Sequence, residues 1–83
     1  MKVNLRFFAS LREALGSTEV VEVAEGTTVG AMRDALIARG EPYAGALQRG
    51  RALRMAVSHQ MCAESVVLSD GVELAFFPPV TGG

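Results

Sequence analysis

The C-terminal end of the chain carries the residues whose types best suit chemistry. They are Pro78, Pro79, Val80, Thr81, Gly82 and Gly83. The two prolines fix φ and lack a backbone N–H, so they direct the chain out of a sheet and keep it extended. The β-branched pair that follows prolongs this stiffness. The segment therefore resembles a narrow arm that presents a terminal carboxylate without any side chain beside it.

The α-carboxylate of Gly83 is the candidate reactive group of this arm. It is ionised at neutral pH and is a poor electrophile in that form. Adenylation by ATP would make it open to attack, and the missing Cβ minimises steric resistance. A sulfur nucleophile would then give a thiocarboxylate, and an amine would give an amide.

His59, Cys62 and Glu64 are the other residues whose spacing suggests a site. A structural zinc site needs four ligands, and a thiol nucleophile needs an orienting third group. Neither pattern is present, so we interpret His59 as a strand-end residue and Cys62 as a semi-buried thiol. We accordingly expect no bound metal and no bound cofactor.

The basic stretch "RGRALR" contains Arg49, Arg51 and Arg54. It could meet an acidic partner or a phosphate. No aromatic stacking platform accompanies it, which favours a solvated loop over a nucleic-acid interface.

Composition restricts the class of protein. The chain has 83 residues, of which 49% are hydrophobic and 20% charged, with a net charge of −1. These values indicate one small globular domain without bulk attraction to nucleic acid or to anionic membranes. A single cysteine favours a reducing compartment, and no apolar run approaches the ~20 residues that span a bilayer. The expected location is the cytoplasm.

Residues 2–8 alternate in a way that predicts a half-buried strand. Val3, Leu5 and Phe7 share one face, whereas Phe8 lies on the polar face. Residues 72–77 repeat this pattern, since Phe77 lies on the face that carries a charge and Phe76 lies on the apolar face.

Between these strands we expect a short helix over 10–16, with a capping box between Ser10 and Glu13. A strand over 18–26 follows. The main helix begins after Thr28, buries an apolar stripe and ends at Gly40. A short helix over 42–50 and a strand over 52–61 follow, and residues 64–71 complete the series as a short edge strand and then a turn at Asp70-Gly71. The order predicts an α+β domain in which one main helix crosses a mixed sheet.

Three segments resemble one known family. "DGVELAFFPPVTGG" (70–83), "VNLRFFASLREALG" (3–16) and "AVSHQM" (56–61) are similar to the small, sulfur-carrying subunit of molybdopterin synthase, the MoaD family. Val72 and Ser58 depart from the family, which commonly has aspartate and asparagine there. Both positions affect local turns and leave the terminal arm unchanged.

The resemblance implies a ubiquitin-like β-grasp fold over residues 1–77 and a flexible, extended tail over 78–83. In this fold the first and last strands are parallel neighbours at the sheet centre. Phe8 and Phe77 would then lie on one face beside the exit of the tail. These two residues and Met61 are the expected partner-binding positions.

The resemblance also implies a function. A ubiquitin-activating-like adenylyltransferase would adenylate Gly83 with ATP, and a sulfurtransferase system would install sulfur. The tail would donate that sulfur to cyclic pyranopterin monophosphate inside the large subunit, in a 2:2 heterotetramer that makes the molybdenum cofactor precursor. The acid-base residues would belong to the large subunit, so this chain would be a non-catalytic, sulfur-donating subunit.

Three alternatives remain from the sequence. The chain could be the sulfur carrier of another pathway, such as thiamine synthesis. It could be a ubiquitin-like protein modifier that joins Gly83 to lysines. It could also be a β-grasp binding module whose tail only extends the last strand.

Overall fold

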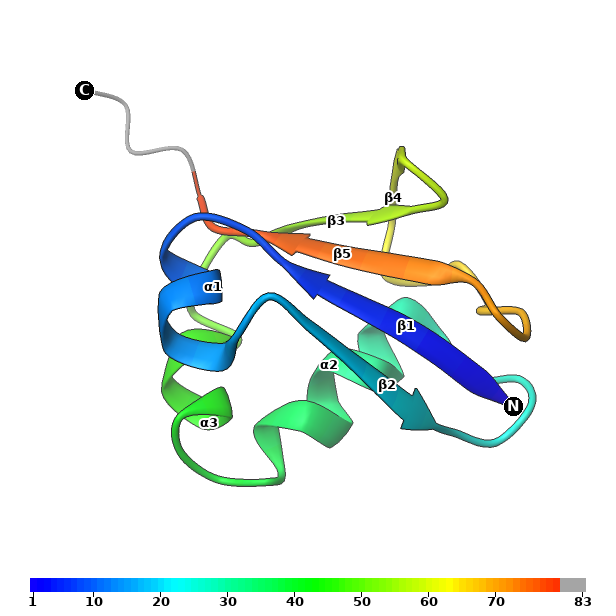
Figure 1. Cartoon of the computed structure of the whole chain (residues 1–83), viewed down its shortest axis with the longest axis horizontal. Coiled ribbons are helices and arrows are strands. Elements are labelled where there is room, and N and C mark those ends of the chain that lie inside the picture. Colours follow the sequence, from blue (N-terminus) through cyan, green and yellow to red (C-terminus); the bar gives the residue numbers. More distant parts are fainter. Residues whose placement is uncertain (80–83) are drawn as a thin grey trace.

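The structure, a computed structural model, describes residues 1–79 of the chain. The predicted roles of Val80, Thr81, Gly82 and Gly83 lie outside the described residues. The elements, shown in Figure 1, are β1 (Lys2–Phe7), α1 (Ser10–Leu15), β2 (Thr18–Glu22), α2 (Val29–Ile37), α3 (Tyr43–Ala46), β3 (Arg54–Val57), β4 (Gln60–Cys62) and β5 (Glu73–Phe77).

One mixed sheet organises the domain. Its five strands have the order β2-β1-β5-β3-β4. Strands β1 and β5 are parallel, with Leu5 opposite Leu74 and Phe7 opposite Phe76, and the other pairs are antiparallel. The first and last strands are therefore neighbours near the centre of the sheet, which confirms the expectation.

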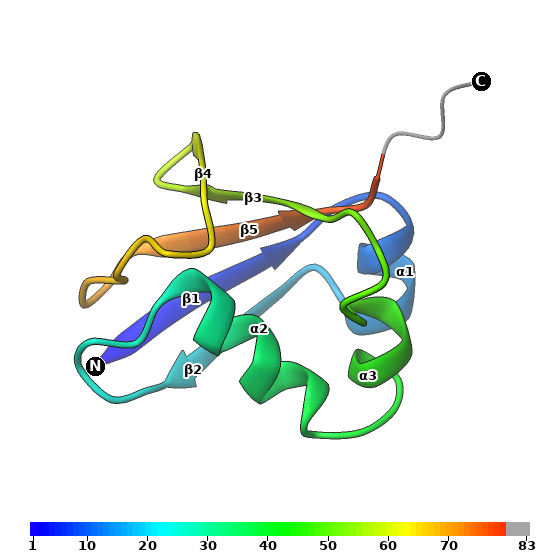
Figure 2. The same ribbon diagram turned by 180° about the vertical axis from the view of Figure 1, so that it is seen from behind.

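The core lies between one face of the sheet and α2, as Figure 2 shows from behind. Strand β1 contributes Val3, Leu5 and Phe7, all buried, which confirms the predicted alternation. Helix α2 begins where expected, because Thr28 Oγ1 accepts a hydrogen bond from the Ala31 N–H at 3.1 Å. Its predicted stripe of Val29, Met32 and Leu36 is buried. Among residues 1–79, no helix lies against the opposite face of the sheet.

Two of the expected strand boundaries are wrong. Residues 52–61 form a hairpin of β3 and β4, because Ser58 and His59 adopt left-handed backbone conformations with φ of 49° and 70°. The short edge strand expected within 64–71 is reduced to one bridge between Thr28 and Val67, whereas the turn expected at Asp70-Gly71 is present. Within residues 1–79, none of the helices has the length and apolar character needed to cross a membrane.

The predicted capping box is also wrong. Ser10 is already the first residue of α1, and the N-cap position is Ala9, which has φ of 52°. The chain leaves β1 through Phe8 and turns sharply at Ala9, so the Ser10 side chain lies beyond the position from which it could cap. The Leu11 and Arg12 amides instead donate to main-chain carbonyls of Phe8 and Ala9.

The hairpin between β3 and β4 gives a prediction about stability. Two-residue hairpin turns with positive φ prefer Asn-Gly, because each L-residue with a side chain is strained there. The double substitution Ser58→Asn/His59→Gly should raise the free energy of unfolding by about 1 kcal/mol, since relief of strain exceeds the added unfolded-state entropy of glycine. Loss of the His59 contact with Glu73 matters little, because the histidine side chain is 79% exposed.

Urea denaturation of the variant and of the unchanged chain measures this difference. Gln60→Gly, placed in β4 where no positive φ is needed, is the control and should lower stability. Equal losses in both variants would contradict the left-handed turn.

A candidate docking surface at the ends of β1 and β5

Two stacked phenylalanines mark the carboxyl ends of β1 and β5. The rings of Phe8 and Phe77 are parallel within 6°, with centroids 4.7 Å apart. They meet because Phe7 pairs with Phe76 in parallel register, and the Phe8 N–H extends the ladder to the Phe76 carbonyl at 3.2 Å. Successive side chains alternate between faces, so this second ring pair lies on the open face. Both rings are half-buried.

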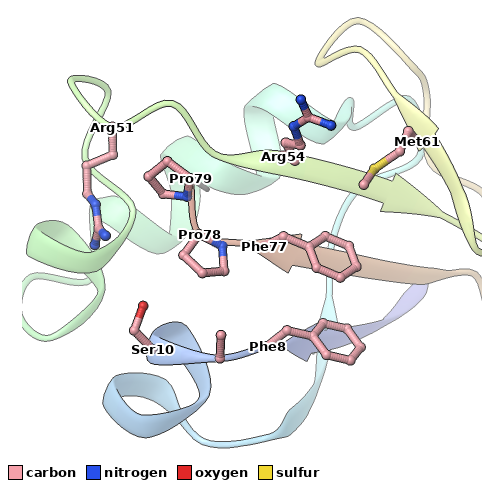
Figure 3. Close-up of a pocket in the computed structure, with 9 residues that line it drawn as sticks. Phe8, Ser10, Arg51, Arg54, Met61, Phe77, Pro78 and Pro79 are labelled. Atoms are coloured by element: carbon pink, nitrogen blue, oxygen red, sulfur yellow. The ribbon is translucent and has the colours of Figure 1, made fainter. Parts of the chain in front are cut away.

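A shallow groove of about 610 Å³ opens beside the ring pair (Figure 3). The described residues that line it are Phe8, Ala9, Ser10, Arg51, Arg54, Met61, Phe77, Pro78 and Pro79. All three expected partner-binding residues, Phe8, Met61 and Phe77, are therefore brought to one surface. Their role in binding a partner remains a prediction.

The sheet itself explains why this face is hollow. Met61 of β4 pairs with Ala56 of β3, which pairs with Ala75 of β5, so these three side chains share the face of Phe77. The two alanines are buried, whereas Met61 is 59% exposed. Small side chains between larger ones leave a recess with an apolar rim. The strand pairing thus places Met61 on the same face as Phe77.

Pro78 and Pro79 stand where β5 ends and where the groove begins. Neither residue has a backbone N–H, so neither can continue the sheet ladder as a donor. The chain accordingly leaves the sheet directly after Phe77. This part of the predicted arm agrees with the described structure, and the arm beyond Pro79 is not described.

The basic stretch does not form the single solvated loop that the sequence suggested. Arg49 lies 2.9 Å from Asp34 and also pairs with Glu64. Arg51 and Arg54 instead line the groove. The three side chains have different surroundings because Arg49 and Arg51 belong to the loop after α3, whereas Arg54 is the first residue of β3.

Arg51 and Arg54 form the cationic wall of the groove. Arg54 pairs with Phe77 in the sheet, which places it beside the aromatic rings. Among residues 1–79, no carboxylate oxygen lies within 4.0 Å of either guanidinium, and the Arg51 guanidinium donates to the Ala46 carbonyl at 3.1 Å. Arg6 differs, since it lies over the Phe8 ring at 5.0 Å and 3.7 Å from Glu73.

Arg33 supports this wall from inside the protein, and sequence reasoning missed it. The residue is only 3% exposed. Its guanidinium donates to the carbonyls of Leu47 at 2.8 Å, Gln48 at 2.6 Å and Arg51 at 3.0 Å. It also pairs with Glu64 at 3.2 Å. Arg33 thereby fixes the segment that leads from α3 to the groove.

Burial lowers the pKa of the Arg33 guanidinium, and the nearby charge of Arg49 lowers it further, while Glu64 opposes both effects. A signal for this residue was available in the sequence. Arg33 follows Met32 and stands four residues after Val29, so it belongs to the apolar stripe of α2. A charged residue in such a stripe must be satisfied by buried partners.

His59, Cys62 and Glu64 are directed to different partners. His59 lies 3.6 Å from Glu73, whereas Glu64 pairs with Arg33 and Arg49. Cys62 is a free, half-buried thiol that packs against the core. In the part of the chain that the structure describes, no three His, Cys, Asp or Glu side chains gather as metal ligands would.

Comparison with known families and sequences gives a consistent result. A family model described as "ThiS family" matches residues 5–83. A molybdopterin synthase sulfur carrier subunit from Escherichia coli K12 is 40% identical over 81 residues, which cover 98% of this chain and 99% of that protein. Small archaeal modifier protein 3 of Haloferax volcanii is 33% identical over 92 residues, covering 100% of both chains.

The fold is shared with solved structures. A chain in a complex of subunits 1 and 2 of the molybdopterin-converting factor from Helicobacter pylori superposes with a TM-score of 0.69. The match covers 100% of each chain at 21% identity, so it bears on the fold alone. Together with the parallel β1–β5 pair and the helix across the sheet, this likeness confirms the expected β-grasp architecture.

Proposed function

Because the chain belongs to the ThiS family, we propose that it is the sulfur carrier subunit of a molybdopterin synthase. The observation that carries this proposal is the 40% identity to the Escherichia coli sulfur carrier subunit over nearly the whole of both chains. The β-grasp fold and the groove beside Pro78 and Pro79 support it, since a carrier must be recognised where its terminal arm leaves the domain.

The proposed reaction uses Gly83. A carboxylate oxygen of Gly83 attacks the α-phosphorus of ATP on an activating adenylyltransferase, and pyrophosphate leaves. A sulfur nucleophile delivered by a sulfurtransferase system then displaces AMP and leaves a thiocarboxylate. The large subunit accepts this arm and catalyses transfer of the sulfur to cyclic pyranopterin monophosphate, while water restores the carboxylate.

In this scheme the described residues of the chain bind the large subunit and take no part in catalysis. Phe8, Met61 and Phe77 provide the apolar docking surface, and the prolines direct the arm toward the partner. We propose that the large subunit and this chain assemble as a 2:2 heterotetramer. The reaction needs ATP and reduced sulfur, so we assign it to the cytoplasm.

Intact-mass spectrometry tests the proposal. The protein is incubated with an adenylyltransferase that activates molybdopterin synthase sulfur carriers, together with ATP and a sulfur source. We expect its mass to rise by the exchange of one oxygen for one sulfur, and the product should support molybdopterin formation with the large subunit. Omission of ATP should abolish the change.

The matched control is a chain from which only Gly83 is deleted. It retains every residue of the described domain, so it should fold normally and yet stay unmodified. An unchanged mass for the full chain, or a full mass shift for the deletion variant, would overturn the assignment of Gly83.

Protein modification is a second candidate, because a small archaeal modifier protein matches the whole chain. The same incubation separates the two functions. A modifier would appear in amide-linked adducts with lysines of other proteins, whereas a carrier would accumulate as the thiocarboxylate. A carrier for thiamine synthesis would be thiocarboxylated but would not support molybdopterin formation.

A further inference from the structure

We propose that the large subunit meets the groove with an acidic side chain next to an apolar one, and that its carboxylate pairs with Arg54. This inference rests on the proposed function, and it specifies the chemistry of the partner at the docking surface. The apolar side chain would lie against Phe8, Phe77 and Met61, while the carboxylate would face the cationic wall formed by Arg51 and Arg54.

The local charge of the groove differs from that of the protein. The chain has a net charge of −1, yet the described lining residues include two arginines and no carboxylate. Glu73 of β5 already faces Arg6 and His59. Asp34 and Glu64 pair with Arg49. Within the described chain, the groove thus has positive charge that lacks an internal counterpart.

The arrangement fits a protein partner. Arginine and aromatic side chains are enriched where protein interfaces concentrate binding energy, and an arginine beside apolar surface favours a planar carboxylate. The two rings stack on each other with centroids 4.7 Å apart, and Arg6 lies over the Phe8 ring, so in the described residues the pair offers no row of separate ring faces on which successive bases could stack. Arg54 is exposed and lies directly beside Phe77, so it can reach an incoming side chain without a change in the sheet.

Binding of the full chain to the large subunit, measured by calorimetry at about 50 mM and about 500 mM salt, tests this inference. Arg54→Glu should weaken binding at least ~10-fold at low salt, because a like charge would face the partner's carboxylate. Arg54→Gln should weaken it about two- to five-fold. High salt should reduce both differences, since the Debye length falls from about 14 Å at the lower salt concentration to about 4 Å at the higher one.

Lys2→Glu is the matched control. It makes the same change in net charge at the opposite end of β1, away from the groove. It should leave the dissociation constant within about two-fold, because distant exposed charges are largely screened. Circular dichroism of each variant verifies that the fold is intact.

The comparison with Phe77→Ala tests the docking surface separately from the acidic contact with Arg54. If Phe77→Ala weakens binding but Arg54→Glu behaves like Lys2→Glu, the acidic contact is wrong and the docking surface stands. If neither substitution weakens binding, the groove is not the interface. If the unchanged chain does not bind the large subunit, the assignment of this partner also falls.

Discussion

Phe76→Ala is expected to remove about 3–5 kcal/mol from the free energy of unfolding, which is most of the stability of so small a domain. Phe76 is 0% exposed and its ring stacks on Phe7 with centroids 5.7 Å apart. Truncation leaves a cavity between the central strands and α2, and these rigid elements can collapse only partly. Chemical denaturation followed by circular dichroism measures the loss.

Phe77→Ala is the matched comparison, because it makes the same substitution one residue later in β5. Its ring lies half-buried on the open face, so the stability loss should be far smaller. Binding to the large subunit should weaken by about 1–3 kcal/mol, as expected for an aromatic interface anchor. A variant at Phe77 that unfolds, alongside a stable variant at Phe76, would show that the strand faces were assigned the wrong way round.

Arg33→Met should cost about 3–5 kcal/mol of stability, because it removes a buried guanidinium that makes several charge-assisted hydrogen bonds, one of them to the partly exposed Glu64. The Leu47 carbonyl would lose its donor, whereas the Gln48 and Arg51 carbonyls would each lose one donor and keep a backbone amide. Methionine fills much of the same volume, so the loss reports on polar satisfaction more than on packing. Arg33→Lys keeps the charge but not the planar fork of hydrogen-bond donors. Its stability should lie between those of the unchanged chain and Arg33→Met.

Arg39→Met is the control for this prediction. Arg39 follows α2 and pairs with Glu19 at 2.7 Å, but the pair is partly exposed. Its loss should cost less than about 1 kcal/mol. Equal stability of the Arg33 and Arg39 variants in urea would contradict a structural role for the buried guanidinium.

A second measurement separates the positioning role of Arg33 from its contribution to stability. If Arg33 acts on docking through Arg51, then Arg33→Lys alone should weaken binding to the large subunit. In a chain that already carries Arg51→Ala, the same substitution should have little further effect. Independent, additive losses in this double-mutant cycle would mean that Arg33 affects binding by another route. The titration is done at a temperature where every variant is folded.

Much of the fold could be predicted because the responsible patterns are local. The alternation of Val3, Leu5 and Phe7 fixes the buried face of β1, and Thr28 identifies the start of α2. Phe8 and Phe77 are each an aromatic residue on the otherwise polar face of a strand. The family resemblance implied the parallel pairing of the strands that brings the two rings together.

The failures arose where backbone conformation or distant partners decide the outcome. Serine and histidine are not typical of a left-handed hairpin turn, so the sequence around Ser58 reads as a continuous strand. Arg49 and Arg54 are close in the sequence but meet different surroundings, because ion pairing with α2 depends on how the chain returns past that helix. No local pattern encodes that path.

The docking surface is assembled from the two ends of the chain, since Phe8 follows the first strand and Phe77 closes the last. A chain that is unfolded or truncated at its N-terminus can still carry the terminal glycines, but it has neither the ring pair nor the groove. A partner that docks on this surface therefore binds the terminus only when the whole domain is folded. Selection of intact carriers follows from strand order alone and requires no separate quality-control factor.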